Sequence, residues 1–202
     1  ASELSDLQSA SAQAREVAGR LADRTVQLVR RADQLSSLAA REPGRFTARE
    51  LLVDGLEHSA VLLADQAGIV TDSTLLPRGT NISALPYFQA ARSGAPGKLG
   101  LQGPLRLTPA GAILLPVIQR VQAADGSFAG VVVIAVEAAH ITERAHLPKH
   151  PQALFALVDD NGRILASTVG AGPLPARQLP ASTWETLKAQ SSKPVLPQVA
   201  GP

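Results

Sequence analysis

The residue best placed to do chemistry is Arg120, which stands inside a run of apolar residues that has the pattern of a strand. A guanidinium is a planar double donor and matches the two oxygens of a carboxylate. Because an unpaired buried charge is very costly, Arg120 must face a pocket, a salt bridge or solvent. If it faces a pocket, the sequence predicts a site for an acidic small molecule.

Catalytic and metal chemistry find little support in the sequence. The chain has no cysteine, which excludes thiolate catalysis, disulfides and sulfur-based zinc sites. It contains no nucleophile elbow, no phosphate-binding loop and no zinc-protease motif. His140, His146 and His150 are closely spaced, but Pro148 breaks the helix that would bring them together. We therefore expect this segment to have no enzymatic activity, no metal site and no cofactor.

Composition bounds the class of protein. With 202 residues, the chain suits one domain or two small ones. A net charge of +2 and 3% aromatic residues argue against nucleic-acid binding. No stretch of 18 apolar residues and no export signal is present, and position 1 is not Met. We expect a segment of a longer chain, in which a membrane span could lie just outside either end.

Two strands joined by a tight turn carry Arg120. Residues 111–137 contain Asp125-Gly126 between two runs rich in Val and Ile. Gly accepts the positive φ that a reversing turn requires, so this pattern predicts a hairpin. Residues 131–136 are continuously apolar, as in a strand that is covered on both faces.

A long helix is expected over residues 1–41, which contain no proline and one glycine. Pro43-Gly44 should end it. Five residues spaced by seven form an apolar line on this helix, namely Leu7, Ala14, Leu21, Leu28 and Leu35. The line fits a helix packed on its own domain, a dimerising stalk, or a combination in which each half does one of these.

An internal repeat is indicated by two similar strand–turn–strand patterns, at residues 60–74 and 154–168. Five identities recur at one offset, in the pairs Leu63/Leu157, Asp65/Asp159, Gly68/Gly162, Ser73/Ser167 and Thr74/Thr168. Short helices are expected at residues 46–58, where Thr47 and Glu50 form a capping-box pattern, and at 84–92, 138–146 and 184–190. Residues 75–109 are a long connection rich in Gly and Pro, and such connections are often functional.

This order of elements, with the phrase DGSFAGVVV at residues 125–133, resembles the Cache sensor domains of bacterial transmembrane receptors. The resemblance covers about residues 1–168 and is closest to receptors with diguanylate cyclase or histidine kinase outputs. It implies an α+β fold, in which a long N-terminal helix packs on a PAS-like antiparallel sheet and a partial second module follows. The implied domains are residues 1–44 (helix), 45–146 (sensor) and 151–202 (second module). The residues that carry it are Asp65, Gly68, Gly79, Asn81, Ile82, Tyr87, Phe88, Gly94, Arg120, Asp125, Gly126, Phe128, Gly130 and Val131.

The resemblance implies a periplasmic ligand sensor, anchored in the inner membrane and dimeric through its N-terminal helix. The ligand would be a small molecule such as a carboxylate, held between the sheet and the long connection. Leu85-Pro86 replaces the Asp-Arg pair of many members, which puts amino-acid binding in doubt and leaves an apolar or vestigial pocket open. A ligand-free structural domain that responds to a partner protein is the alternative. The expected ligand-binding residues are Asn81, Tyr87, Phe88, Arg106, Arg120 and Glu137.

Overall fold

The computed structural model describes residues 2–53, 55–94, 100–101, 105, 112–144, 156–158, 162, 164–167 and 181–190. These residues fall into two compact units. The sheet unit holds residues 28–107 and 114–137, and the hairpin unit holds residues 1–27, 108–113 and 138–195. Within the described part of the chain, no helix has both the length and the apolarity needed to cross a membrane.

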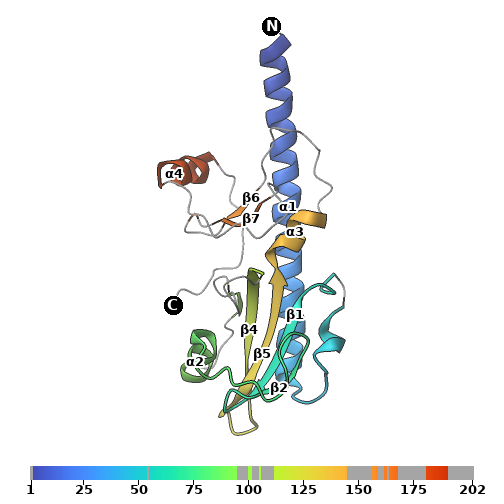
Figure 1. Cartoon of the computed structure of the whole chain (residues 1–202), viewed down its shortest axis with the longest axis vertical. Helices are drawn as coiled ribbons and strands as arrows, with labels where there is room; N and C mark the ends of the chain where they lie inside the picture. Colours follow the sequence, from blue (N-terminus) through green and yellow to red (C-terminus); the bar gives the residue numbers. More distant parts are fainter. Residues whose placement is uncertain are drawn as a thin grey trace. The chain divides into compact units, whose positions relative to one another are not determined.

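A five-stranded antiparallel sheet forms the centre of the sheet unit (Figure 1). Its strand order is β2-β1-β5-β4-β3, so the first hairpin lies beside the long hairpin that follows it in sequence. The predicted hairpin around Asp125-Gly126 is confirmed, with Gly126 at a φ of 83°. The strands are β1 (Ala60–Asp65), β2 (Val70–Ser73), β3 (Gly100–Leu101), β4 (Leu114–Gln122) and β5 (Phe128–Glu137).

One side chain stabilises the turn between β4 and β5. Asp125 Oδ1 accepts hydrogen bonds from the Ser127 hydroxyl at 2.6 Å and from the Ser127 backbone N–H at 3.0 Å. Both bonds favour the charged carboxylate and hold the pKa of Asp125 below its ordinary value. The turn is therefore fixed by local interactions that the sequence itself encodes.

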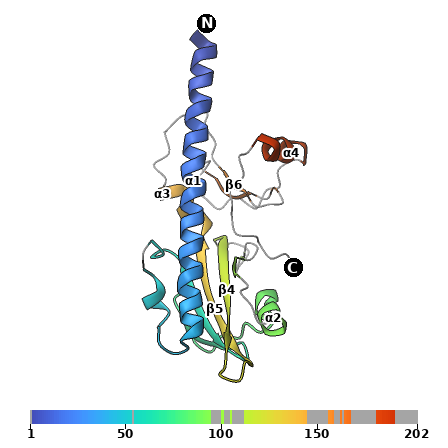
Figure 2. The ribbon, with the colours of Figure 1, turned by 180° about the vertical axis from the view of Figure 1, so that it is seen from behind.

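Helix α1 (Ser2–Arg41) begins and ends where the sequence predicts. Its residues 28–41 run along one face of the sheet, behind it in Figure 1 and in front of it in Figure 2. Leu28 of the predicted apolar line is buried, but Leu21 and Leu35 are partly exposed, and the side chains of Leu7 and Ala14 lie outside the description. The line that is buried most completely in residues 28–41 is offset from the heptad line and consists mainly of small residues: Val29, Ala32, Ser36, Ala39 and Ala40.

The predicted helix over residues 46–58 is wrong in extent. A single 3₁₀ turn, η1 (Arg49–Leu51), forms there, although the Thr47 hydroxyl accepts the Glu50 N–H at 3.3 Å as the capping pattern suggested. The chain then turns, with Gly55 at a φ of 96°. Leu51 and Leu56 are both buried, so tertiary burial of two leucines prevails over the local helical pattern.

The hairpin unit contains a two-stranded sheet of β6 (Ala156–Val158) and β7 (Ile164–Ser167). Helix α3 (Ala138–Arg144) packs against both strands. The unit also contains α4 (Ala181–Gln190). The pair Ala156↔Ser167 repeats Leu62↔Ser73 at an offset of 94 residues. The register of the two strands shifts after Leu63 in the first hairpin and after Leu157 in the second, which is the same offset. The turn glycines, Gly68 and Gly162, both have a φ of 81°. The internal repeat predicted from sequence is therefore confirmed for its hairpin.

Candidate ligand-binding site

The register of the sheet places a row of small residues on the face opposite α1. Side chains alternate between the two faces along a strand, and paired residues share a face. Ala135 on β5 lies between its partners Ala60 on β1 and Pro116 on β4, so three small residues form one row across three strands. The next two rows are Leu62–Val133–Ile118 and Ala64–Val131–Arg120. The first row is too small to fill the space above it.

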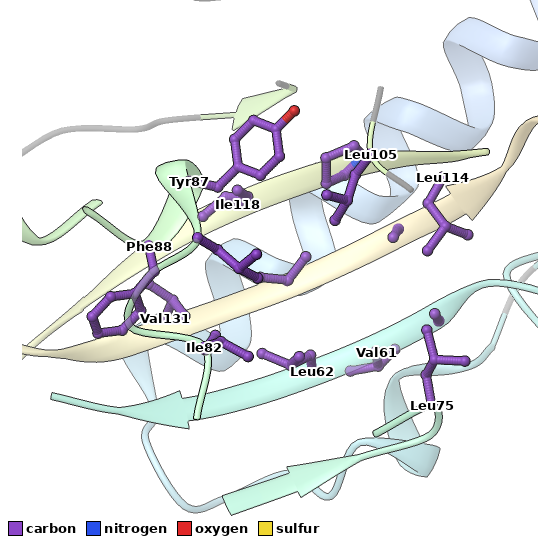
Figure 3. A pocket seen from close by; sticks show the side chains of 15 residues that line it. Val61, Leu62, Leu75, Ile82, Tyr87, Phe88, Leu105, Leu114, Ile118 and Val131 are labelled. Atoms are coloured by element: carbon purple, nitrogen blue, oxygen red, sulfur yellow. The ribbon is translucent and has the colours of Figure 1, made fainter. Parts of the chain in front are cut away.

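A cavity occupies this space, between the sheet and the chain that runs from β2 through α2 (Pro86–Ser93) (Figure 3). Its floor comes from β1, β4 and β5, and Leu105, which is bridged to Leu114, forms part of the wall. About 50 Å³ remains open to a water-sized sphere. The lining residues are Ala60, Val61, Leu62, Leu75, Ile82, Leu85, Tyr87, Phe88, Leu105, Leu114, Pro116, Ile118, Val131, Val133 and Ala135.

The lining of the cavity is almost entirely hydrocarbon. The Tyr87 hydroxyl is the one polar side-chain atom among these fifteen residues, and in Figure 3 its oxygen points away from the neighbouring side chains. Leu75 is 52% exposed, so the cavity reaches the surface beside it. A volume of this size exceeds the space that one water molecule needs, but water is stable in a cavity only where several polar groups bind it. The described walls therefore favour an apolar occupant.

Arg120 lies two rows beyond the row of small residues and does not line this cavity. Its Nη1 donates to the carbonyl oxygens of Ala91 at 2.9 Å, Arg92 at 3.2 Å and Gly94 at 3.0 Å. These carbonyls end α2, where the helix leaves acceptors unpaired and where a cation is favoured by the helix dipole. The geometry thus gives Arg120 a positioning role, since it holds the C-terminal end of α2 against β4.

An aromatic pair connects Arg120 to the cavity wall. The guanidinium of Arg120 lies 5.1 Å from the centroid of the Phe128 ring, within the range of a cation–π interaction. Phe128 in turn meets Phe88 edge to face, with ring centroids 5.5 Å apart. Phe88 is 2% exposed and lines the cavity. A displacement of Phe88 by a ligand would therefore reach the contact that fixes α2.

The remaining sequence-predicted residues have different surroundings. Tyr87 and Phe88 line the cavity, as the sequence predicted for the connection. Asn81 is exposed, and its Oδ1 accepts the Ser83 N–H at 2.8 Å, which stabilises the turn before α2. Glu137 is partly buried at the end of β5 and does not line the cavity. Arg106 lies outside the described residues.

Several lining residues were not predicted from the sequence. Pro116 and Ile118 share the face of Arg120 at a spacing of two, so strand alternation could have found them. Leu75 and Leu105 lie in the long connection, where no periodic pattern exists to indicate a direction. Their part in the wall depends on how the connection folds back over the sheet.

A second hollow lies between the end of α1 and the edge of β4, and its lining is different. It is wide and open, with a volume of about 540 Å³. Most of its lining side chains are polar, and they are Gln34, Ser37, Ala40, Arg41, Gln119, Arg120 and Gln122. Its breadth and openness are those of a hydrated surface groove, so the smaller and more enclosed apolar cavity is the stronger candidate site.

Comparison with known proteins places the fold. No family model matches the sequence, and no curated protein is significantly similar to it. Solved structures are similar, however. The extracellular domain of rpHK1S-Z16, described as a histidine kinase, aligns with a TM-score of 0.67 and 22% identity over 86% of this chain and 76% of that one.

Two further structures come from characterised receptors. The sensor domain of the V. cholerae histidine kinase DctB aligns at a TM-score of 0.61, with 15% identity over 91% of this chain and 77% of that one. The ligand-binding domain of the Pseudomonas aeruginosa chemoreceptor PctB, in complex with L-Arg, aligns at 0.54, with 19% identity over 82% and 71%. The chain therefore has the fold of Cache-type sensor domains, and the predicted α+β class is confirmed.

Proposed function

We propose that this chain is the extracytoplasmic ligand-sensing domain of a transmembrane signalling receptor. The observation that carries the proposal is the cavity between the sheet and α2, within a fold shared with ligand-binding domains of receptors. A small molecule in this cavity would contact both the sheet and α2. Because Phe88 belongs to the cavity wall and to the aromatic pair that meets Arg120, binding would bias the position of α2. The domain itself binds and does not catalyse.

Signal transmission is proposed to use α1. This helix contributes residues to both compact units, and residues 28–41 cover the face of the sheet opposite the cavity. We propose that it pairs with a second copy along the apolar line of its N-terminal half and leads to a cytoplasmic histidine kinase or diguanylate cyclase. The partly exposed Leu21 supports such pairing. Cysteine cross-linking at Leu21→Cys tests the dimer, since the chain has no other cysteine.

The domain boundaries at residues 44, 146 and 151 are proposed on the same basis. The order of α1, the five-stranded sheet and the second hairpin along the chain supports this division, while the two compact units divide the chain within α1 and after β5. Residues 145–155 lie outside the description, so the sensor and second-module assignments rest on the repeated hairpin and on the order of elements.

A thermal-shift screen tests the sensor proposal. Compounds should include short alcohols, carboxylates, amino acids, polyamines and purines, because a ligand that binds the native state raises its melting temperature. We expect at least one compound to give a saturable rise that is lost in Ala135→Leu, which places a larger side chain in the row of small residues. If no compound raises the melting temperature, the ligand-free alternative replaces this proposal.

A further inference from the structure

The chemistry of the walls indicates the class of ligand that the cavity accepts. Among the described residues, fourteen of the fifteen lining side chains are hydrocarbon. The floor strands β1, β5 and β4 use their main-chain groups to pair with one another. An ionic group that entered would lose its water without gaining a partner from these walls, which costs several kcal/mol.

The one cation on the cavity face of β4 does not change this conclusion. Arg120 directs Nη1 to three carbonyl oxygens at the end of α2 and places its guanidinium over Phe128. Withdrawing it to meet a carboxylate would leave those carbonyls without their donor. Arg120 also does not line the cavity, so a carboxylate that lies within the described walls gains no charged partner.

The size of the cavity limits the ligand further. The open volume of about 50 Å³ is more than one water molecule needs and suits a compact small molecule. The exposed Leu75 marks the side on which a small polar end could remain in water. A peptide or a helix could not enter such a space, so the occupant is a small molecule.

We propose that the cavity binds a neutral, compact, mainly hydrocarbon molecule, such as a short branched alcohol, and discriminates against carboxylates of the same skeleton. This inference rests on the proposed sensor function. It makes Arg120 a positioning residue and assigns the recognition of the ligand to the rows of small and branched side chains on β1, β4 and β5.

A matched set of probes tests the charge preference. The isopentyl skeleton is offered as 3-methylbutan-1-ol, 3-methylbutanoate and 3-methylbutan-1-amine, and binding is followed by NMR of labelled isoleucine methyl groups. Ile82 and Ile118 line the cavity, whereas Ile134 is fully buried on the opposite face and serves as the internal control. We expect saturable shifts at Ile82 and Ile118, no shift at Ile134, and binding of both charged probes at least about tenfold weaker than that of the alcohol.

Three Ala→Leu variants locate the binding. Ala135→Leu should abolish the shifts by filling the cavity, and Ala60→Leu fills it from the partner strand if the first variant does not fold. Ala90→Leu is the matched control, because Ala90 is exposed on α2 and does not line the cavity, so binding should persist. Binding that survives both cavity substitutions would overturn the assignment to this site.

The remaining outcomes separate the two proposals. If 3-methylbutanoate shifts Ile82 and Ile118 with an affinity within tenfold of the alcohol, the neutral class is wrong and the sensor function stands. If no probe shifts these methyl groups but the broader screen finds a charged ligand, the inference about ligand class is wrong and the sensor function stands. A different neutral, mainly hydrocarbon ligand from that screen would support both. If neither experiment finds any ligand, both proposals fail.

Discussion

The two faces of the sheet are packed to different degrees. On the α1 face, Val117 and Ile134 are fully buried, and the amide of Gln119, which is 5% exposed, donates to Asp33 on the helix at 2.8 Å. On the opposite face, one row of small residues leaves an open apolar space. On the α1 face, the buried Gln119 amide thus has a hydrogen-bond partner. The opposite face retains unfilled volume, which has some cost in stability.

This difference indicates which face supports the fold and which can respond. Small residues on α1, among them Ala32 and Ser36, allow the helix to approach the sheet closely, so that face has no room for a ligand. The opposite face is covered by a long connection and the two-turn helix α2, which is held at its end by Arg120. Such a cover can shift without disturbing α1.

Isoleucine truncation on each face should show the largest difference. Ile134→Ala removes methyl groups from the packed face and should cost about 2–5 kcal/mol, as core truncations do. Ile118 faces existing open space, so Ile118→Ala loses fewer contacts. Its cost should be smaller than that of Ile134→Ala by at least about 1 kcal/mol. Urea unfolding of both variants measures the two costs. Equal costs would mean that the cavity face is packed as well as the α1 face.

Enlarging an alanine on each face reverses the comparison and should have the next largest effect. Ala32→Leu inserts a side chain into a fully buried position of α1 and should destabilise the protein by about 1–3 kcal/mol through overpacking. Ala135→Leu enters the cavity, so we expect a change within about 1 kcal/mol in either direction. Melting curves of both variants are the measurement. A loss in Ala135→Leu as large as that in Ala32→Leu would contradict the existence of usable space.

Removal of the Arg120 side chain tests how the cover is held. Arg120→Ala should cost about 1–2 kcal/mol, because charge-assisted bonds to the α2 carbonyls are lost at a partly exposed site. Hydrogen exchange should rise in residues 86–94 and stay unchanged in residues 28–41. Arg120→Lys keeps the charge but not the planar stacking on Phe128, and should restore part of the protection. Faster exchange in both segments would show that Arg120 stabilises the whole unit.

Acidification should have the smallest effect and should not distinguish the faces, because Asp125 lies in the turn that β4 and β5 share. Its pKa is lowered in the folded state by the Ser127 hydroxyl and backbone N–H. The stabilisation is therefore present above the ordinary pKa of a carboxyl and is lost as the pH falls through the lowered value. Asp125→Asn should reduce the loss of stability below about pH 4. An identical pH profile in the variant and the parent would contradict this role.

Local patterns explain why much of the fold could be predicted. The turn at Asp125-Gly126, the end of α1 near Pro43 and the repeated hairpins each depend on residues close in sequence. The helix predicted over residues 46–58 was wrong because the burial of Leu51 and Leu56 outweighed a capping pattern that formed as expected. Propensity is a weak guide wherever tertiary burial opposes it.

The candidate site was predicted in part. Tyr87 and Phe88 line the cavity, and the ligand-binding roles of all six expected residues remain predictions, namely Asn81, Tyr87, Phe88, Arg106, Arg120 and Glu137. The partners of Arg120 lie 26 to 29 residues away in sequence, on a helix whose position over the sheet no local pattern specifies.

The sequence by itself determined the long N-terminal helix, the long hairpin and its repeat, and the presence of an arginine on an apolar strand, because these follow from periodicity and turn chemistry. It did not predict β3, which forms inside the long connection. The tertiary structure alone decided that Ala60, Ala135 and Pro116 share one row and that Arg120 ends at α2. Strand register and helix placement bring together residues that are distant in sequence. The cavity and the hydrogen bonds of Arg120 to the end of α2 therefore form only when the sheet assembles.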